Sequence, residues 1–275
     1  MNRVAAQCGG PVFALRVGSV FVQDIVDALA EQHAELASVI EGRTAAEWAQ
    51  PSRCPGWDAA DVLLHLAQTH EMAVATVHDR IAAAAAETGF LPRESASGTP
   101  VDDAAAAAVA DQKTSGDEIA QRWYKTADEL VKVLRDADPS KRVVWVSGYL
   151  SVHTLTATRL SESWIHSGDI ADAFGVTLAP TDRLRHIARL AWRTIPYAFE
   201  REGRELHGPV AFHLVGPGGD EWTFEPEAPA LTTISGPAEE LCMVAARRIA
   251  AKDSSLRGNG PDASGVLELV RTYAL

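Results

Sequence analysis

The sequence of 275 residues has few cysteines, an excess of negative charge and no long apolar run. Its three cysteines, Cys8, Cys54 and Cys242, are widely spaced and odd in number. This excludes a disulfide framework and a cysteine-based zinc motif, and it predicts a reducing, cytoplasmic location. The net charge of −12 argues against binding to nucleic acid or to an anionic membrane surface. No stretch approaches about 18 uninterrupted apolar residues, so we expect no membrane span.

The N-terminal segment contains an apolar run at residues 12–22, which Arg16 interrupts. No small-residue cleavage site with a charged leader precedes it, so the segment does not read as a signal peptide. We therefore assign residues 1–19 to an N-terminal tail or extension.

Hydrophobic residues make up 47% of the chain, which is enough for a full core, and their spacing is helical through the first two thirds. Thr44 and Ser115 each begin a capping box, and Asp58 and Ser151 stand at helix N-cap positions. The expected helices span residues 22–41, 59–86, 116 to the residues before Pro139, and 152–174. A short Ala-rich helix at 104–110, a loop at 87–100 and a short strand or extended loop at 142–147 lie between them. Four long helices predict a four-helix bundle over residues 20–178.

The pattern changes after residue 178, and we expect a smaller α+β domain over residues 179–275. Thr181 is expected to cap a helix over 182–201. Two β-rich runs, 210–215 and 221–224, flank the turn sequence Gly-Pro-Gly-Gly-Asp and predict a hairpin. A third strand at 230–234 and helices at 237–251 and 265–273 complete the domain. The fold class predicted for the whole chain is α+β.

One segment carries the strongest chemical signal. Arg159, Glu162, His166 and Asp169 form a polar stripe along the helix expected at 152–174. Glu162 and His166 stand four residues apart, one turn on the same face, so they can share a metal ion. His65, in an apolar run of another helix, is a candidate third ligand. Two interpretations stay open: a solvated face with one Arg–Glu pair, or a buried three-ligand site with an open coordination position.

The remaining histidines have no ligand-like spacing, because their positions drift from the face that carries His65 or lie in the second domain. His33 is expected in the core or lining a pocket, and His153 at a pocket mouth. We expect structural roles also for the remaining five histidines, which are His70, His78, His186, His207 and His213.

Two motifs give a resemblance to a known family. They are Pro-Gly-Trp-Asp at 55–58, followed by Leu-His-Leu-Ala at 64–67, and Glu162-x-x-x-His166-x-x-Asp169-Ile with a later glycine. Together they resemble the N-terminal domain of mycothiol-dependent maleylpyruvate isomerases, in the DinB/YfiT-like superfamily of four-helix-bundle metalloproteins. The resemblance implies His65, Glu162 and His166 as metal ligands, and zinc as the metal. The second domain resembles, more weakly, the sterol-carrier-like α+β domain appended to many members. The catalytic arginine of the isomerase C-terminal domain is not matched to a particular residue of this sequence.

The resemblance also implies a low-molecular-weight thiol, mycothiol in similar proteins, as co-substrate. Metal coordination would make such a thiol a thiolate at neutral pH. Asp169 is expected to orient an imidazole or to make an unrelated helix contact. Arg159 is expected to hold Glu162 or to bind an acidic substrate. Trp57, Trp123, Trp145 and Tyr149 are expected in the pocket wall or in the core.

Three functions follow from these expectations. The first is a metal-dependent S-transferase or cis–trans isomerase that uses a thiol and acts on a small electrophile. The second is a thiol-free metal enzyme, a hydrolase, lyase or isomerase. The third is a non-catalytic, metal-stabilised protein that binds a small ligand. A homodimer is expected as the oligomeric state.

Overall fold

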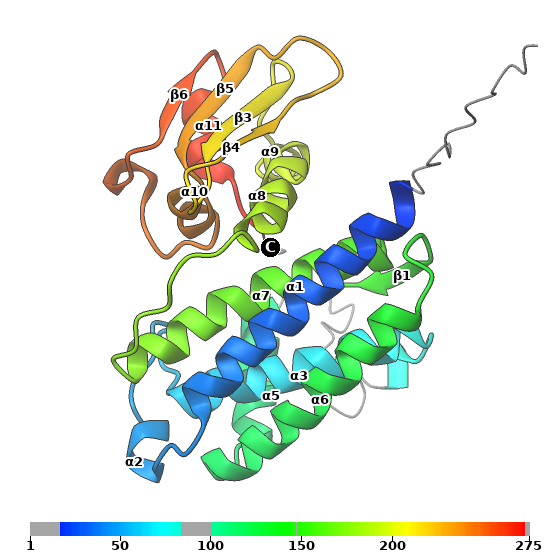
Figure 1. Cartoon of the computed structure of the whole chain (residues 1–275), viewed down its shortest axis with the longest axis vertical. Coiled ribbons are helices and arrows are strands. Elements are labelled where there is room, and N and C mark those ends of the chain that lie inside the picture. Colours follow the sequence, from blue (N-terminus) through cyan, green and yellow to red (C-terminus); the bar gives the residue numbers. More distant parts are fainter. Residues whose placement is uncertain (1–16, 84–100, 147, 273–275) are drawn as a thin grey trace, which may run out of the picture.

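The computed structural model describes residues 17–83, 101–146 and 148–272, without the side chains of 17–24, 101 and 102. The expected loop at 87–100 and most of the expected N-terminal tail lie outside these residues. The chain has an α+β fold, as predicted, with the helices of the first part and a four-stranded sheet in the second (Figure 1). Among the described residues, no helix is both long and apolar enough to cross a membrane.

Four long helices form a bundle in the first part. They are α1 (Val17–Ile40), α3 (Ala59–Val77), α6 (Gly116–Asp136) and α7 (Val152–Ala173). α7 packs between α1 and α3, and α6 lies on the other side of the same pair (Figure 1). The short helices α2 (Ala45–Trp48) and α5 (Val101–Gln112) and the hairpin of β1 (Arg142–Trp145) and β2 (Gly148–Ser151) join them. The bundle core consists of aliphatic side chains with the fully buried Trp123.

Four of the capping signals read from the sequence, all in the first part of the chain, are confirmed. Thr44, Asp58 and Ser115 each accept a hydrogen bond from the backbone of the third helical residue, whose carboxylate contacts the cap in return. Ser151 caps α7 in the same position. α3 is shorter than the expected 59–86, because the chain leaves the helix after Val77 and Asp79 takes a left-handed conformation with φ of 59°.

The second part contains a mixed sheet of order β4-β3-β5-β6. Its strands are β3 (Val210–Val215), β4 (Glu221–Phe224), β5 (Thr232–Pro237) and β6 (Arg257–Asn259). β3 and β4 form the predicted hairpin, and β5 runs parallel to β3. The helices α8 (Leu184–Arg193), α9 (Ile195–Arg201), α10 (Ala238–Ala245) and α11 (Ala263–Leu269) and a 3₁₀ turn, η1 (Ala251–Asp253), accompany the sheet.

Three expectations for the second part are wrong in detail. The single helix expected at 182–201 is two helices, because the chain breaks at Thr194 and Pro196 stands at the start of α9. The Thr181 side chain does not cap the first of these helices, α8. Arg183 stands at its N-cap position and makes no side-chain capping hydrogen bond. The helix expected at 237–251 ends at Ala245, and Arg247 then turns the chain with φ of 59°.

The two parts share one hydrophobic core, in which side chains of α1, α3 and α7 meet those of α8, α10 and the sheet. Polar contacts join them as well: Ser161 of α7 donates a hydrogen bond of 2.8 Å to Thr272. We propose a domain boundary at residues 178/179, within the segment between α7 and α8. The contacts across it give the site described next side chains from both parts.

Candidate metal centre and its cavity

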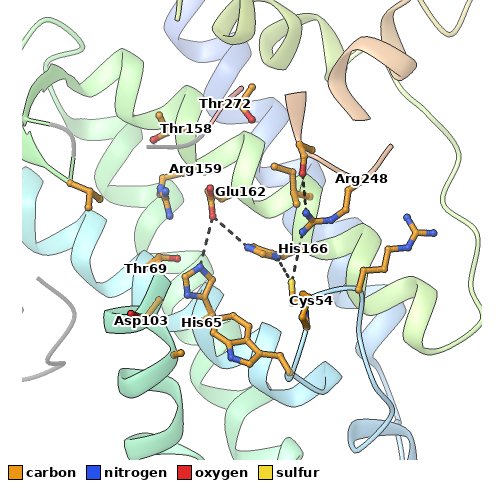
Figure 2. Close-up of a pocket in the computed structure, with 18 of the residues that line it drawn as sticks. Cys54, His65, Thr69, Asp103, Thr158, Arg159, Glu162, His166, Arg248 and Thr272 are labelled. Carbon is orange, nitrogen blue, oxygen red and sulfur yellow. Dashed lines mark hydrogen bonds and ion pairs between the residues drawn. The ribbon is translucent and has the colours of Figure 1, made fainter. Parts of the chain in front are cut away.

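A cavity of about 540 Å³ lies where the bundle meets the second part (Figure 2). Its wall includes His65, Glu162 and His166 together with Arg159 and Arg248. The polar stripe of α7 therefore does not face bulk solvent, and the interpretation of that stripe as a solvated surface is wrong for Arg159, which is 4% exposed. Asp169, from the same stripe, is 1% exposed.

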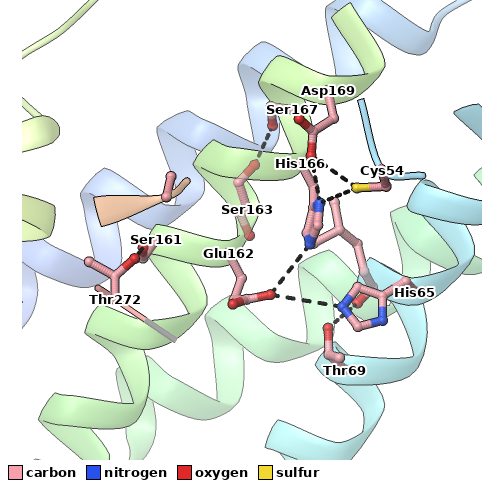
Figure 3. A network of polar contacts seen from close by, with 12 residues as sticks. Cys54, His65, Thr69, Ser161, Glu162, Ser163, His166, Ser167, Asp169 and Thr272 are labelled. Atoms are coloured by element: carbon pink, nitrogen blue, oxygen red, sulfur yellow. Dashed lines mark hydrogen bonds and ion pairs between the residues drawn. The ribbon is translucent and has the colours of Figure 1, made fainter. Parts of the chain in front are cut away.

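The three candidate ligands converge in the cavity wall, two from α7 and one from α3 (Figures 2 and 3). Glu162 Oε2 lies 3.5 Å from His166 Nε2 and 3.8 Å from His65 Nε2. The two imidazole rings are 5.2 Å apart and nearly perpendicular. The three donor atoms all lie within 4.8 Å of one another, so a single cation could contact all three.

The charge states of these groups depend on burial and on each other. Burial acts to raise the pKa of Glu162, but contacts with His166 and His65 hold it well below its usual range. Burial lowers the pKa of His65. Burial also opposes protonation of His166, yet its hydrogen bonds to Asp169, Cys54 and Glu162 raise its pKa well above its usual range. Because Nε2 must give up any proton to bind a metal, metal and proton compete for this imidazole.

Asp169 forms the second half of the constellation. Its Oδ2 accepts a hydrogen bond of 3.0 Å from His166 Nδ1, which leaves Nε2 of that ring directed at Glu162 (Figure 3). Arg248 binds the same carboxylate through two bonds, 2.7 Å from Nε to Oδ1 and 2.5 Å from Nη2 to Oδ2. Despite its burial, these donors lower the pKa of Asp169 to about 2. The predicted orienting role of Asp169 toward an imidazole thus has the required geometry.

Arg248 and Cys54 were missed as site residues from the sequence. Arg248 reaches α7 from the second part because the left-handed turn at Arg247 ends α10 and redirects the chain. Cys54 Sγ lies 3.3 Å from Asp169 Oδ2 and 3.8 Å from His166 Nδ1. With His166 and Asp169 it forms a second group that could hold a metal ion. No local pattern marks Arg248, whereas the neighbouring Pro-Gly turn does mark Cys54.

That turn explains the first sequence motif. The Trp57 N–H donates 3.0 Å to the Cys54 carbonyl across Pro55 and Gly56, and Gly56 has φ of 82°. Proline second and glycine third are the residues that such a turn requires. The turn puts both Cys54 and Trp57 in the cavity wall, where the Trp57 ring lies 5.2 Å from that of His65.

The other aromatic candidates divide between wall and core. Trp145 lines the cavity, Trp123 is buried in the bundle core, and Tyr149 is 71% exposed and is not among the described residues of this cavity wall. His33 is buried, and its Nε2 lies 3.2 Å from Ser163 Oγ. His70 is fully buried beside that pair.

The other histidines stay outside the described cavity. His78 is exposed at the end of α3, and His153 is half-buried at the start of α7. In the second part, His207 contacts Asp262 and His213 contacts Glu225. His186 lies in α8.

Comparison with known proteins gives two relatives over nearly the whole chain. Over 258 residues the chain is 31% identical to an uncharacterized protein of Mycobacterium tuberculosis (strain CDC 1551 / Oshkosh), covering 91% of this chain and 95% of the relative. The same values hold for an uncharacterized protein of Mycobacterium tuberculosis strain ATCC 25618 / H37Rv.

Among solved structures, the fold is similar to that of mycothiol-dependent maleylpyruvate isomerase, with a TM-score of 0.56 at 17% identity. The match covers 88% of this chain and 95% of that enzyme, so it includes both parts. A histidine-to-alanine mutant of the enzyme matches with the same TM-score at 16% identity. The family model for the mycothiol maleylpyruvate isomerase N-terminal domain matches residues 29–171, the segment that contains all three candidate ligands. The chain therefore belongs to the mycothiol maleylpyruvate isomerase N-terminal domain family.

Proposed function

We propose that this protein is a metal-dependent enzyme that uses a low-molecular-weight thiol, of the mycothiol type, to transfer sulfur to a small electrophile or to isomerise it. The observation that carries the proposal is the convergence of His65, Glu162 and His166 within 4.8 Å in the wall of a cavity. Membership of a family described by mycothiol and maleylpyruvate isomerase favours thiol chemistry in that cavity.

The donor set fits zinc. Two imidazole nitrogens and one carboxylate form a three-ligand set that leaves a coordination position open, as in catalytic zinc sites. In such a set, His65 Nε2, His166 Nε2 and Glu162 Oε2 would hold the ion. When bound there, zinc supplies Lewis acidity that lowers the pKa of a coordinated thiol or water.

The residues around the ligands position them. Asp169 accepts the Nδ1 hydrogen bond of His166, which fixes the ring and its tautomer. Arg248 binds both oxygens of Asp169 and ties the second part of the chain to α7. The side chains of Trp57 and Trp145 give the cavity wall part of its apolar surface.

The cavity also has the size that the proposed reaction needs. A volume of about 540 Å³ lies within the range of small-molecule sites. A thiolate that adds to a carbon–carbon double bond leaves a single bond, about which the product of addition can rotate. Expulsion of the same thiolate then gives the other geometric isomer and regenerates the thiol. If instead a leaving group departs from the electrophile, the product keeps the sulfur, and the reaction is S-transfer.

A thiol-free metal enzyme is the alternative that uses the same residues, with water or a substrate oxygen in the place of the thiol. A non-catalytic, metal-stabilised protein that binds a small ligand is the third possibility. The family description favours the first function over both. The cytoplasmic location and the homodimer remain predictions.

The test is the thiol dependence of turnover. Zinc-loaded full-length protein is assayed with maleylpyruvate and with a panel of small electrophiles, with mycothiol present or omitted. We expect turnover that requires both mycothiol and zinc and that His166→Ala abolishes. Turnover that is equal without the thiol would support the thiol-free enzyme. Stoichiometric zinc without turnover of any electrophile would support the binding protein.

A further inference from the structure

Arg159 is the buried cation of the cavity wall that the proposed chemistry leaves without a role. It lies in α7 one turn before Glu162 and is 4% exposed. Its guanidinium carbon lies 4.7 Å from the ring centroid of Trp145, so the ring covers one face of the cation. Its Nε and Nη1 are buried and have no hydrogen-bond acceptor among the described residues.

The other two arginines of the wall have partners. Arg248 binds Asp169 through two bonds, and Arg53 donates 2.7 Å to Asp172. Arg159 makes no such pair, although buried guanidinium groups ordinarily bind carboxylates through two parallel bonds. Arg159 is therefore an arginine of the cavity wall with two buried donors that no described residue accepts from.

Glu162 is the nearest structural explanation for Arg159, since the two side chains lie beside each other on α7 (Figure 2). However, they form no ion pair within 4.0 Å, and Glu162 directs Oε2 toward His65 and His166 instead. A metal held by these three residues would engage the Glu162 carboxylate further. Arg159 would then face the cavity with its charge uncompensated.

The charges around the cavity favour an anion at this position. The charged groups here include two carboxylates, Glu162 and Asp169, and two guanidinium groups, Arg159 and Arg248, so a divalent metal would add net positive charge. The carboxylate of Asp103, also in the wall, is on an exposed residue where solvent screens it. An acidic ligand would therefore gain more from the inner wall than a neutral ligand of the same shape.

We propose that Arg159 is the anion subsite of this cavity, where its guanidinium binds a carboxylate of a small acidic substrate while Trp145 covers one face of the cation. This inference rests on the proposed function in one respect: the reacting end of the substrate would lie toward His65, Glu162 and His166. It assigns anion recognition to Arg159 and not to Arg248, whose donors Asp169 already uses.

The experiment measures binding of maleate, a four-carbon dicarboxylate, to zinc-loaded full-length protein by titration calorimetry. The neutral diamide of maleate is the matched ligand. Arg159→Gln and Arg159→Lys are the test variants. Arg135→Gln is the matched control. Arg135 lies on the surface of α6, paired with Asp27, so this substitution removes the same charge outside the cavity.

We expect Arg159→Gln to weaken maleate binding by about 10- to 100-fold, the effect of losing hydrogen bonds to a charged group. Arg159→Lys should keep part of the affinity, since it retains the charge but not the paired donors. Arg135→Gln should bind maleate as the wild type does, and binding of the diamide should not change in any variant. Zinc content should stay at the wild-type value in all of them.

Because a buried guanidinium without an acceptor is costly, Arg159→Gln should not lower the melting temperature of the ligand-free protein. Unchanged maleate affinity in Arg159→Gln would overturn the proposal, as would wild-type protein that does not bind maleate. Joint loss of zinc and maleate binding would also overturn it, because Arg159 would then act by supporting Glu162. These outcomes are independent of thiol-dependent turnover, whose absence would count against the proposed function alone.

Discussion

The pair of Asp169 and Arg248 gives the most informative perturbation, because it joins the two parts of the chain beside the candidate metal ligands. Asp169→Asn keeps the shape of the side chain and removes the charge that Arg248 and His166 contact. Removing one member of a buried ion pair costs about 3–5 kcal/mol. The Arg248 side chain is 19% exposed and can recover some hydration, so we expect the lower end, about 3 kcal/mol, in the free energy of unfolding of the metal-free protein.

The same substitution should also weaken metal binding, because Asp169 orients the imidazole of His166. Loss of such a partner typically lowers metal affinity about 10- to 100-fold. Arg248→Gln should lower zinc affinity less, since Asp169 still accepts from His166 Nδ1. Urea unfolding of the single and double variants gives the coupling energy, and competition with a chelator gives the zinc affinity.

We expect the double variant to lose less than the sum of the two single losses, with a coupling of about 1–3 kcal/mol. Additive losses would show that the two groups do not depend on each other energetically. Unchanged zinc affinity in Asp169→Asn would contradict the orienting role.

Three further predictions concern metal binding, pH and packing. His65→Ala should lose zinc measured by plasma mass spectrometry, whereas the exposed His78→Ala should keep it; equal zinc in both would contradict the ligand assignment. Burial lowers the pKa of His33 from 6.5 to about 4, so the folded state disfavours protonation of this side chain. The free energy of unfolding of the metal-free protein should therefore fall by up to about 3 kcal/mol as the pH falls from 6.5 to 4. In urea unfolding, His33→Gln should flatten this pH dependence, and an unchanged slope would refute the prediction. Gly116→Ala should lower the stability by about 1–3 kcal/mol, because the added Cβ would lie 2.2 Å from the buried indole of Trp48 in α2. Gly168→Ala has open space around the added Cβ, so in thermal unfolding it should be neutral or stabilising. Equal effects of the two substitutions would contradict this packing.

Local signals explain why much of the bundle could be predicted. The capping boxes at Thr44 and Ser115 and the N-cap at Asp58 depend on residues within three positions, and the structure contains each of them. The hairpin of β3 and β4 also follows from adjacent residues. Such signals need no knowledge of the rest of the fold.

Tertiary contacts explain what could not be predicted. β6 is three residues long and pairs with β5 without a distinctive pattern of its own. The contact between Arg248 and Asp169 joins residues 79 positions apart, and it depends on the left-handed turn at Arg247. Helical spacing brought Glu162 and His166 to one face, but only the packing of α3 against α7 brings His65 to them.

The most direct test of the central claim is the X-ray absorption spectrum of the zinc-loaded protein, because it reports which atoms surround the ion. The account predicts one zinc per chain with nitrogen and oxygen ligands near about 2.0–2.2 Å and two imidazole signatures. A sulfur shell near about 2.3 Å would instead locate the ion with Cys54, His166 and Asp169, and it would contradict the assignment of His65 and Glu162 as ligands.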